Sequence, residues 1–271
     1  MGNFVKIAWH GLHFGEEPSL SGDKGAGTIF FTGCNLKCVY CQNYQISWQN
    51  LGKEYSVEEL AGLMLELQNQ GALNIDLVSP TIWVNKIKLA IINAREKGLS
   101  LPIVWNSNAY ESVEMIKGLK GLVDIYLPDF KYGDDNLALK YSGVKNYVKK
   151  AKAAIKEMLN QVGNIKLSEQ GIAERGLMVR HLILPGNVEN SLKVLEYIRE
   201  IDKDICFNLM SQYEPVFKAK NFAEIDRNIS AEEYKKVFDY LLELELENGW
   251  VQEMKSHAVF LPDFTKEKPF G

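Results

Sequence analysis

The chain contains 271 residues, of which 46% are hydrophobic and only 8 are proline, so it is long and apolar enough to bury one sizeable core. Its 31 lysines and arginines against 35 aspartates and glutamates give a net charge of −4, which offers no broad cationic face to a nucleic acid. The first residues lack a charged leader before an apolar run, and no stretch approaches the roughly 20 apolar residues of a membrane helix. We therefore expect a cytoplasmic globular protein with no membrane partner.

Short apolar runs alternate with amphipathic patterns along most of the chain, which is typical of βα units and a parallel sheet. Capping boxes mark two helix starts, Ser56 with Glu59 and Ser230 with Glu233. Helices are expected at residues 57–70, 83–97, 111–120, 145–162, 189–202 and 231–247. Six strands, each apolar enough to be buried on both faces, are expected at 27–33, 73–79, 101–106, 123–130, 178–184 and 205–211.

Six βα units joined by right-handed crossovers form either an open doubly wound sheet or an incomplete, TIM-like barrel, and we favour the barrel. A small hairpin-like insertion is expected at residues 163–176, with Gly171 and Gly176 as turn residues. We expect one domain over residues 1–271, with a lead-in at 1–26, the barrel core at 27–215, and a C-terminal helix and extension at 216–271.

Polar residues follow every expected strand at its carboxyl end, the edge where ligands bind in either architecture. Loops are polar in any case, so one such position carries little weight, whereas six sets at one edge indicate a binding site. The sets are Cys34; Ser79, Pro80 and Thr81; Asn106, Ser107 and Asn108; Asp129 and Lys131; Arg180 with Pro185 and Gly186; and Ser211, Gln212, Tyr213 and Glu214.

Cys34, Cys38 and Cys41 form a C-x3-C-x2-C motif directly after the first strand, where Gly33 allows a sharp turn. A structural zinc site normally has four protein ligands, and so does a ferredoxin-type [4Fe–4S] cluster. Three thiolates would leave one iron of a cluster open to a substrate or cofactor. The motif therefore predicts a catalytic cluster, and no further cysteines are present to build a second one.

A fourth ligand could come only from elsewhere in the chain. Cys206 lies inside an apolar run, which favours a small buried core residue. His10 and His13 precede the first strand, and they could approach the cluster, contact substrate or satisfy hydrogen bonds in the core.

The cysteine motif resembles that of radical S-adenosylmethionine (SAM) enzymes. In that superfamily the open iron chelates the amino and carboxylate groups of SAM, and an electron cleaves SAM to a 5′-deoxyadenosyl radical. Tyr40 matches the aromatic position before the third cysteine, which packs on the adenine.

The neighbourhood of the motif is similar to pyruvate formate-lyase activating enzyme-related proteins, from about His13 to Phe264. The resemblance implies a partial (β/α)6 barrel, one [4Fe–4S] cluster, SAM, and a flavodoxin- or ferredoxin-like electron donor. Activating enzymes of this kind abstract the α-hydrogen of a glycine on a partner enzyme. The resemblance rests on GAGTIFFTGCNLKCVYCQNYQIS, DLVSPT, DIYLPDFKY, VRHLILPG and LMSQYEP.

The same resemblance assigns SAM-binding positions. Asp129 and Lys131 match the D-x-K element that lies against SAM, and Tyr213 follows the sixth strand at the same edge. Arg180 matches the arginine of V-R-x-x-x-x-P-G, where a guanidinium suits a carboxylate or ribose hydroxyls. The alternative for Arg180 is a salt bridge to Asp129.

Two positions depart from the family pattern. Ser79 and Thr81 replace the usual G-G-E, so hydroxyls and backbone carbonyls would have to hold the methionine ammonium. Asn106 and Ser107 stand where activating enzymes often carry an acidic ligand to a monovalent cation, which leaves that cation an open question.

The lead-in around Glu16 and Glu17 is rich in polar groups. It either covers the barrel mouth and touches substrate, or forms a surface strap with solvated charges. The residues around 249–252 and 260–264 are apolar enough to pack across the open side of the barrel.

The leading hypothesis is therefore a radical SAM enzyme that acts on a glycine or another residue of a protein or peptide. A second hypothesis keeps the radical chemistry and changes the target to a small molecule or an RNA. A third, from another class, is a non-catalytic iron–sulfur or zinc protein, which predicts a fourth protein ligand and no affinity for SAM.

Overall fold

The computed structural model describes residues 4–254 and 261–270, so residues 1–3 of the expected lead-in and residues 255–260 and 271 of the expected extension lie outside the described residues. Its strands form one sheet in the order β10-β9-β8-β6-β5-β4-β2-β1-β3, with β7 paired to β8. The strands are β1 (Phe4–His13), β2 (Ala26–Phe31), β3 (Lys53–Ser56), β4 (Ile75–Val78), β5 (Ile103–Ser107), β6 (Ile125–Pro128), β7 (Lys166–Leu167), β8 (Ala173–Leu182), β9 (Cys206–Met210) and β10 (Gly249–Val251).

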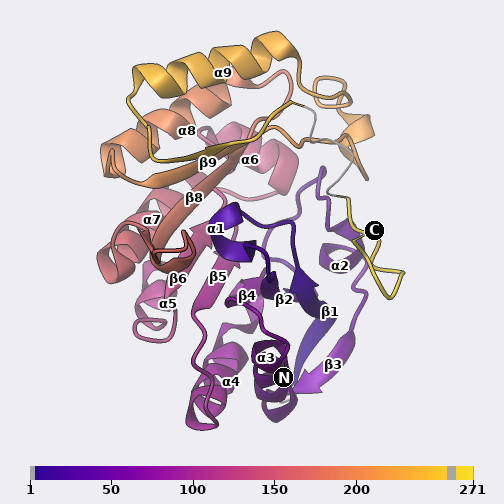
Figure 1. Cartoon of the computed structure of the whole chain (residues 1–271). Helices are drawn as coiled ribbons and strands as arrows, with labels where there is room; N and C mark the ends of the chain where they lie inside the picture. The colour runs from indigo at the N-terminus through magenta and orange to yellow at the C-terminus, as the bar shows by residue number, and fades with distance from the viewer. Residues whose placement is uncertain (1–3, 255–260, 271) are drawn as a thin grey trace.

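The helices mostly follow the strands of the central sheet and cover its outer face (Figure 1). Both predicted capping boxes are present, at Ser56 and at Ser230. The helices are α1 (Pro18–Ser21), α2 (Tyr44–Ser47), α3 (Val57–Asn69), η1 (Thr81–Trp83), α4 (Val84–Glu96), α5 (Val113–Lys117), α6 (Asp135–Ser142), α7 (Tyr147–Val162), α8 (Val188–Ile201), η2 (Ala219–Asn221) and α9 (Ala231–Glu243).

The six strands expected from the sequence are β2, β4, β5, β6, β8 and β9, and they are parallel neighbours in that order. The expected partial (β/α)6 barrel is therefore confirmed. No pairing joins β3 to β10 among the residues described, so the sheet stays open. None of the described helices has the length and apolar character needed to cross a membrane.

Alternation along the strands separates an apolar layer from a polar one inside the curved sheet. On β6, Ile125 and Leu127 belong to an interior cluster, and the next residue of the same alternation is Asp129. On β8, Met178 of the same cluster is followed two residues later by Arg180. The carboxyl ends of the strands therefore turn polar side chains toward the interior.

Helix α1 closes the amino end of this interior (Figure 1). Its Leu20 is fully buried against Val104, Ile125 and Met178, and Cys206 belongs to the same cluster. The prediction of Cys206 as a small buried core residue is confirmed.

Several predicted bounds are wrong. The helix expected at 111–120 is only Val113–Lys117, and the one expected at 231–247 ends at Glu243. The helix expected at 145–162 begins at Tyr147, and an unpredicted helix, α6, precedes it from its Asp134 cap to Gly143. Gly143 has a φ of 70°, a left-handed conformation that ends α6.

The two ends of the chain extend the sheet. The lead-in contains β1, which pairs antiparallel with β2, and the C-terminal extension contains β10, which pairs parallel with β9. The insertion at 163–176 is the expected hairpin, in which β7 pairs antiparallel with β8. Phe264 and Phe270 of the extension pack on Phe30 of β2, with ring centroids 5.3 Å from it in both cases.

Candidate functional site

The loop after β2 brings the three cysteines to the carboxyl edge of the sheet. Gly33 starts the loop with a φ of 88°, which glycine adopts without strain. A Cβ at this position would lie 2.6 Å from Cδ1 of Ile82, so the end of that side chain would have to move. One cavity of about 130 Å³ is lined by the three thiols of Cys34, Cys38 and Cys41.

A chain of hydroxyls ends on the sulfur of Cys38. The hydroxyl of Tyr40 donates to that of Tyr132 at 2.7 Å, and the Tyr132 and Ser142 oxygens lie 2.6 Å apart. Ser142 Oγ in turn donates to Cys38 Sγ at 3.0 Å. Burial raises the pKa of the Cys38 thiol to about 12, so this sulfur is protonated until a metal replaces the proton.

The other two sulfurs also have polar neighbours. Asn108 Nδ2 lies 3.4 Å from Cys34 Sγ, to which it donates, and Cys41 Sγ lies 3.2 Å from Ser47 Oγ. Burial raises the pKa of both thiols. Three desolvated thiols facing one cavity fit an electropositive iron centre, which would bind them as thiolates.

A zinc ion and a [4Fe–4S] cluster need different distances between the sulfurs that bind them. The described residues contain no group of three or more His, Cys, Asp or Glu side chains arranged to hold one metal ion. A zinc ion would need its sulfurs at about 2.3 Å from a single point. In a [4Fe–4S] cluster each cysteine binds a different iron, so the sulfurs lie further apart.

None of the residues considered for a fourth ligand lines the cysteine cavity. Cys206 is the first residue of β9, at the strand end opposite to the cysteine loop, and it is 2% exposed. His13 packs on Phe270 at 4.2 Å between ring centroids, and His10 packs on Tyr55 at 6.2 Å. Burial lowers the pKa of both histidines, so both are neutral at neutral pH.

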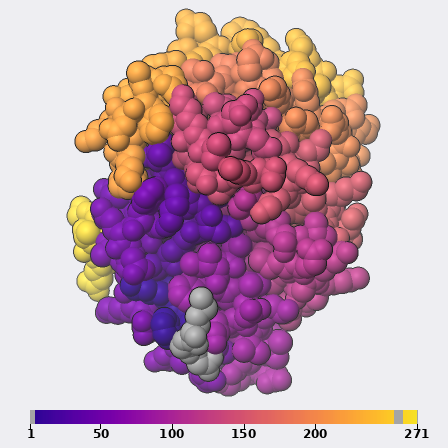
Figure 2. All heavy atoms as spheres, turned by 180° about the vertical axis from the view of Figure 1, so that it is seen from behind, coloured from indigo at the N-terminus to yellow at the C-terminus, as the bar shows by residue number. Residues whose placement is uncertain are grey.

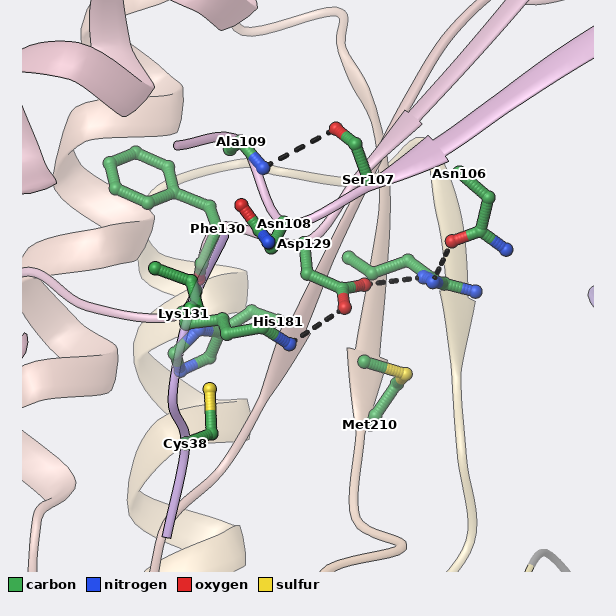
Figure 3. Close-up of polar contacts among 12 residues, drawn as sticks. Cys38, Asn106, Ser107, Asn108, Ala109, Asp129, Phe130, Lys131, His181 and Met210 are labelled. Atoms are coloured by element: carbon green, nitrogen blue, oxygen red, sulfur yellow. Dashed lines mark hydrogen bonds and ion pairs between the residues drawn. The ribbon is translucent and has the colours of Figure 1, made fainter. Parts of the chain in front are cut away.

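Asp129, Lys131 and Arg180 form one charged group at the ends of β6 and β8. Figure 3 shows Asp129 and Lys131 of this group. The backbones of Asp129 and Arg180 are bridged, and Asp129 accepts 2.7 Å hydrogen bonds from Lys131 Nζ and Arg180 Nε. Burial would raise the pKa of Asp129, but the two cations outweigh burial and hold it below its usual value. The alternative considered for Arg180, a salt bridge to Asp129, is therefore present.

Two more groups hold Arg180 in place. Its Nη2 donates to Oδ1 of Asn106 at 2.6 Å, and its Nη1 donates to Oε2 of Glu16 at 3.1 Å. Each of the three guanidinium nitrogens thus donates to a different segment of the chain. Burial, and after it the nearby Glu16, raises the pKa of Asp76 well above its usual value. Burial also raises the pKa of Glu16, which the charge of Arg180 opposes.

The two glutamates of the lead-in point into the barrel. Glu17 is 6% exposed and its Oε1 accepts a 2.7 Å hydrogen bond from Asn208 Nδ2 on β9. Glu16 meets Arg180 on β8, as described above. A surface strap with solvated charges is therefore wrong, because both carboxylates are buried against the last strands of the barrel.

The residues after β4 and β5 that depart from the family pattern are connected through Glu111. This buried carboxylate was not singled out from the sequence. It accepts hydrogen bonds from Thr81 Oγ1 at 2.9 Å, Ser107 Oγ at 2.7 Å and Trp105 Nε1 at 2.9 Å. Thr81 thus points at Glu111 and does not line the cysteine cavity, whereas Ser79 does. Ser79 has a φ of 58°, an uncommon conformation for serine that often marks a functional turn.

The same contacts decide whether Asn106 and Ser107 are free to bind a monovalent cation. Asn106 Oδ1 is occupied by Arg180, and Ser107 Oγ donates to Glu111. A bound cation would face the guanidinium of Arg180, which already supplies positive charge at this point. The side chains of Asn106 and Ser107 are thus committed to other contacts.

Tyr213 lies apart from the cavity. It is 1% exposed, its hydroxyl donates to the backbone oxygen of Ile225 at 2.7 Å, and its ring lies 5.9 Å from that of Tyr40. The residue therefore supports Tyr40 from behind and does not line either cavity of the site. Tyr40 lines the cysteine cavity.

A second cavity of about 190 Å³ adjoins the first and shares Asn106, Asp129, Lys131 and Arg180 with it. Its remaining walls include Glu16 and apolar side chains from the strands and the extension. These are Phe30, Leu182, Met210, Pro262 and Phe270. The second cavity therefore lies next to the cysteine cavity, with the four shared side chains between them.

An open α/β barrel with a three-cysteine loop and a charged cavity at its carboxyl edge defines an enzyme of the iron–sulfur class. The profile of the radical SAM superfamily matches residues 28–168, more than half of the chain, and the chain belongs to that superfamily. Its cofactors are a [4Fe–4S] cluster and SAM.

Two curated proteins are similar over most of the chain. An uncharacterised protein of Methanocaldococcus jannaschii is 33% identical over 238 residues, which cover 84% of this chain and 64% of that protein. This chain therefore spans less than two thirds of the archaeal relative. The pyruvate formate-lyase-activating enzyme of Clostridium pasteurianum is 26% identical over 256 residues, or 86% of this chain and 97% of that enzyme.

Solved structures of SuiB from Streptococcus suis share the fold. The form bound to S-adenosylmethionine has a TM-score of 0.55 at 15% identity, and the match covers 82% of this chain and 48% of SuiB. The form bound to the precursor peptide SuiA has the same TM-score at 14% identity, with 82% and 47% covered. The chain thus spans about half the length of SuiB.

Proposed function

We propose that Cys34, Cys38 and Cys41 hold a [4Fe–4S] cluster with one open iron, and that the enzyme abstracts hydrogen from a glycine or another residue of a partner protein. When bound, the cluster would supply the electron that cleaves SAM. The cleavage yields methionine and the radical that takes the hydrogen. The observation that carries the proposal is the single cavity lined by three buried thiols and by the charged strand ends.

The residues beside the cysteines would position SAM. Ser79 offers oxygen acceptors to an ammonium group, and Lys131 lies on the same cavity to face a carboxylate. Arg180 is directed by three partners and is therefore pre-organised for a carboxylate or ribose hydroxyls. Tyr40 offers a buried ring to the adenine.

We place the substrate in the second cavity, between Glu16 and the apolar walls. Its volume of about 190 Å³ admits a short chain segment and no folded domain. Similarity to the Clostridium enzyme over 97% of its length, and a precursor peptide on SuiB, favour a polypeptide target. The walls combine charged, polar and apolar side chains, which suits a peptide backbone with a small side chain.

The experiment uses anaerobic enzyme with a reduced cluster, SAM and candidate glycyl-radical enzymes. Electron paramagnetic resonance should detect a glycyl doublet in one of them, and the signal should vanish when the acceptor glycine is replaced by alanine. SAM cleavage without a doublet in any candidate would reject glycine as the target while leaving SAM cleavage intact.

A further inference from the structure

The cysteine loop reaches the surface beside a group of side chains that we call the cationic aromatic patch: Lys37, Trp48, Phe217, Lys218 and Lys220. Lys37 belongs to the loop, Trp48 follows α2, and the other three belong to the segment after β9 and its helix η2. Figure 2 shows this orange segment against the purple one that carries the loop. The two segments are joined by a 3.0 Å hydrogen bond from the Lys218 backbone N–H to the oxygen of Val39.

The patch lies directly outside the cysteines. Trp48 Nε1 donates to the backbone oxygen of Cys38 at 3.2 Å. Lys37 Nζ donates to the backbone oxygen of Ser47, whose hydroxyl lies 3.2 Å from Cys41 Sγ. The patch therefore contacts the backbone of Cys38 and the serine that lies beside Cys41.

Positive charge collects on this face although the chain is acidic overall, with a net charge of −4. Lys218 Nζ lies 3.9 Å and Lys37 Nζ 5.3 Å from the ring centroid of Trp48, and Lys220 is exposed. Within residues 4–254 and 261–270, no ion pair neutralises any of these three lysines.

Two acidic residues of the same segment, Glu214 and Glu224, have partners outside the patch. Glu214 accepts a hydrogen bond from Asn228 Nδ2 at 3.2 Å, and Glu224 is paired with Lys140. The positive charges of the patch are therefore not cancelled by these two carboxylates.

The aromatic part of the patch is fixed in place. Phe217 has a φ of 56°, an uncommon conformation for a large side chain, and its ring stacks on Tyr44 with centroids 4.8 Å apart and 8° between planes. The same ring lies 5.3 Å from that of Trp48. A preformed aromatic surface ringed by free cations suits docking of an acidic partner.

We propose that the cationic aromatic patch is the docking surface for the electron donor, an acidic one-electron carrier protein. The proposal rests on the cluster position proposed above, because SAM cleavage needs an electron from outside the chain. The reduced carrier gives one electron to the oxidised cluster and is itself reoxidised, with no bond made or broken. Tunnelling slows steeply with distance, so the donor should approach where the covering protein is thinnest.

Charge complementarity favours a carrier over other occupants of this face. An acidic carrier is repelled by the chain as a whole and attracted at this one patch, which would orient it with its redox centre toward the cysteines. The carrier must also dissociate after each electron, and a small patch of lysines around aromatic rings fits a transient contact.

The test measures binding of a bacterial flavodoxin to the cluster-loaded enzyme by anaerobic titration calorimetry at low and high salt. We expect Lys218→Glu/Lys220→Glu to weaken binding at least tenfold and to slow flavodoxin-driven formation of 5′-deoxyadenosine. Binding of the unmodified enzyme should weaken with added salt. Lys97→Glu/Lys166→Glu makes the same charge change at exposed lysines at the opposite ends of the strands, and should bind like the unmodified enzyme.

Dithionite, a small reductant that needs no docking surface, separates this proposal from the proposed function. Dithionite-driven SAM cleavage by Lys218→Glu/Lys220→Glu should stay within twofold of the unmodified enzyme. Lys218→Gln/Lys220→Gln, which removes charge without reversing it, should bind with intermediate affinity and guards against a folding defect. The proposal would be overturned if both patch variants bound flavodoxin as tightly as the unmodified enzyme. It would also be overturned if the control pair weakened binding as much as Lys218→Glu/Lys220→Glu.

Discussion

The carboxylate of Glu16 accepts a 3.1 Å hydrogen bond from Arg180, across 164 residues of chain. The contact ties the lead-in to β8 and directs the guanidinium into the space shared by the two cavities. Both side chains are nearly buried, at 9% and 13% exposure, so the pair is poorly screened by solvent.

Removing this carboxylate should destabilise the enzyme. Glu16→Ala leaves part of a buried guanidinium without its partner, and we expect a loss of about 3 kcal/mol in the free energy of unfolding. Glu16→Gln keeps an acceptor and should cost less. Glu54→Ala, at an exposed position of β3, should change stability by less than about 0.5 kcal/mol in the same denaturation experiment. Equal stability of Glu16→Ala and the parent would show that the contact is not formed.

The cysteines can be tested one at a time. Cys34→Ala, Cys38→Ala and Cys41→Ala should each lose most of the bound iron and the visible absorption of the reconstituted enzyme, because three thiolates are the fewest that hold such a cluster. Cys206→Ala, in the apolar interior, should keep about four irons per chain. Retention of the full cluster by any of the first three variants would reject that cysteine as a ligand.

The hydroxyl of Ser142 should tune the reduction potential. Its hydrogen bond to Cys38 Sγ stabilises the more negative, reduced state, so Ser142→Ala should lower the potential. One net hydrogen bond corresponds to about 20–60 mV for a one-electron couple. Redox titration followed by electron paramagnetic resonance gives the value, and Ser142→Thr, which keeps the hydroxyl, should restore it. An unchanged potential in Ser142→Ala would exclude this role.

His181 should make stability depend on pH. Burial lowers its pKa to about 4. Its Nδ1 lies 2.7 Å from the backbone oxygen of Phe130, and its Nε2 lies 2.8 Å from Ser191 Oγ. The unfolded chain, with a pKa near 6.5, binds the proton first, so stability falls as pH drops from about 6.5 toward 4.

Between about pH 7 and pH 5 this one group should remove about 2 kcal/mol, measured by urea unfolding. His181→Gln should show a correspondingly flatter dependence on pH, whatever its stability at neutral pH. A variant with the same slope as the parent would assign the pH dependence to other groups.

The central strands could be predicted because each is a continuous apolar run buried on both faces. The lead-in strand β1 could not, since its register shifts between Ile7 and Trp9 and the alternation of side chains breaks there. Strand β10 has only three residues, Gly249–Val251, too few for any periodic signal. Helix α6 has only eight residues, and its Asp134 cap lies three residues after Lys131 of the D-x-K element, so its start is hard to recognise.

The residues of the site were also predictable only in part. Position at a strand end was enough to bring Asn106, Asp129 and Arg180 together, because parallel strands end at one edge. Their precise partners were not predictable. Glu16 and Glu111 act through contacts that only the folded chain creates, and a buried carboxylate leaves no local signal in the sequence.

For two residues, a place at a strand end did not bring the side chain into the cysteine cavity. Tyr213 follows β9 at the same edge, yet its ring turns into the core, and Thr81 after β4 turns to Glu111. A strand end fixes where a backbone lies, and the packing of its neighbours decides where the side chain points.

One measurement tests the central claim most directly. The cluster is reconstituted without oxygen, reduced with dithionite and mixed with SAM, and 5′-deoxyadenosine is quantified by liquid chromatography. We expect 5′-deoxyadenosine together with methionine, and neither product from Cys41→Ala. An intact, reducible cluster that yields no 5′-deoxyadenosine would contradict the assignment of this cavity to reductive cleavage of SAM.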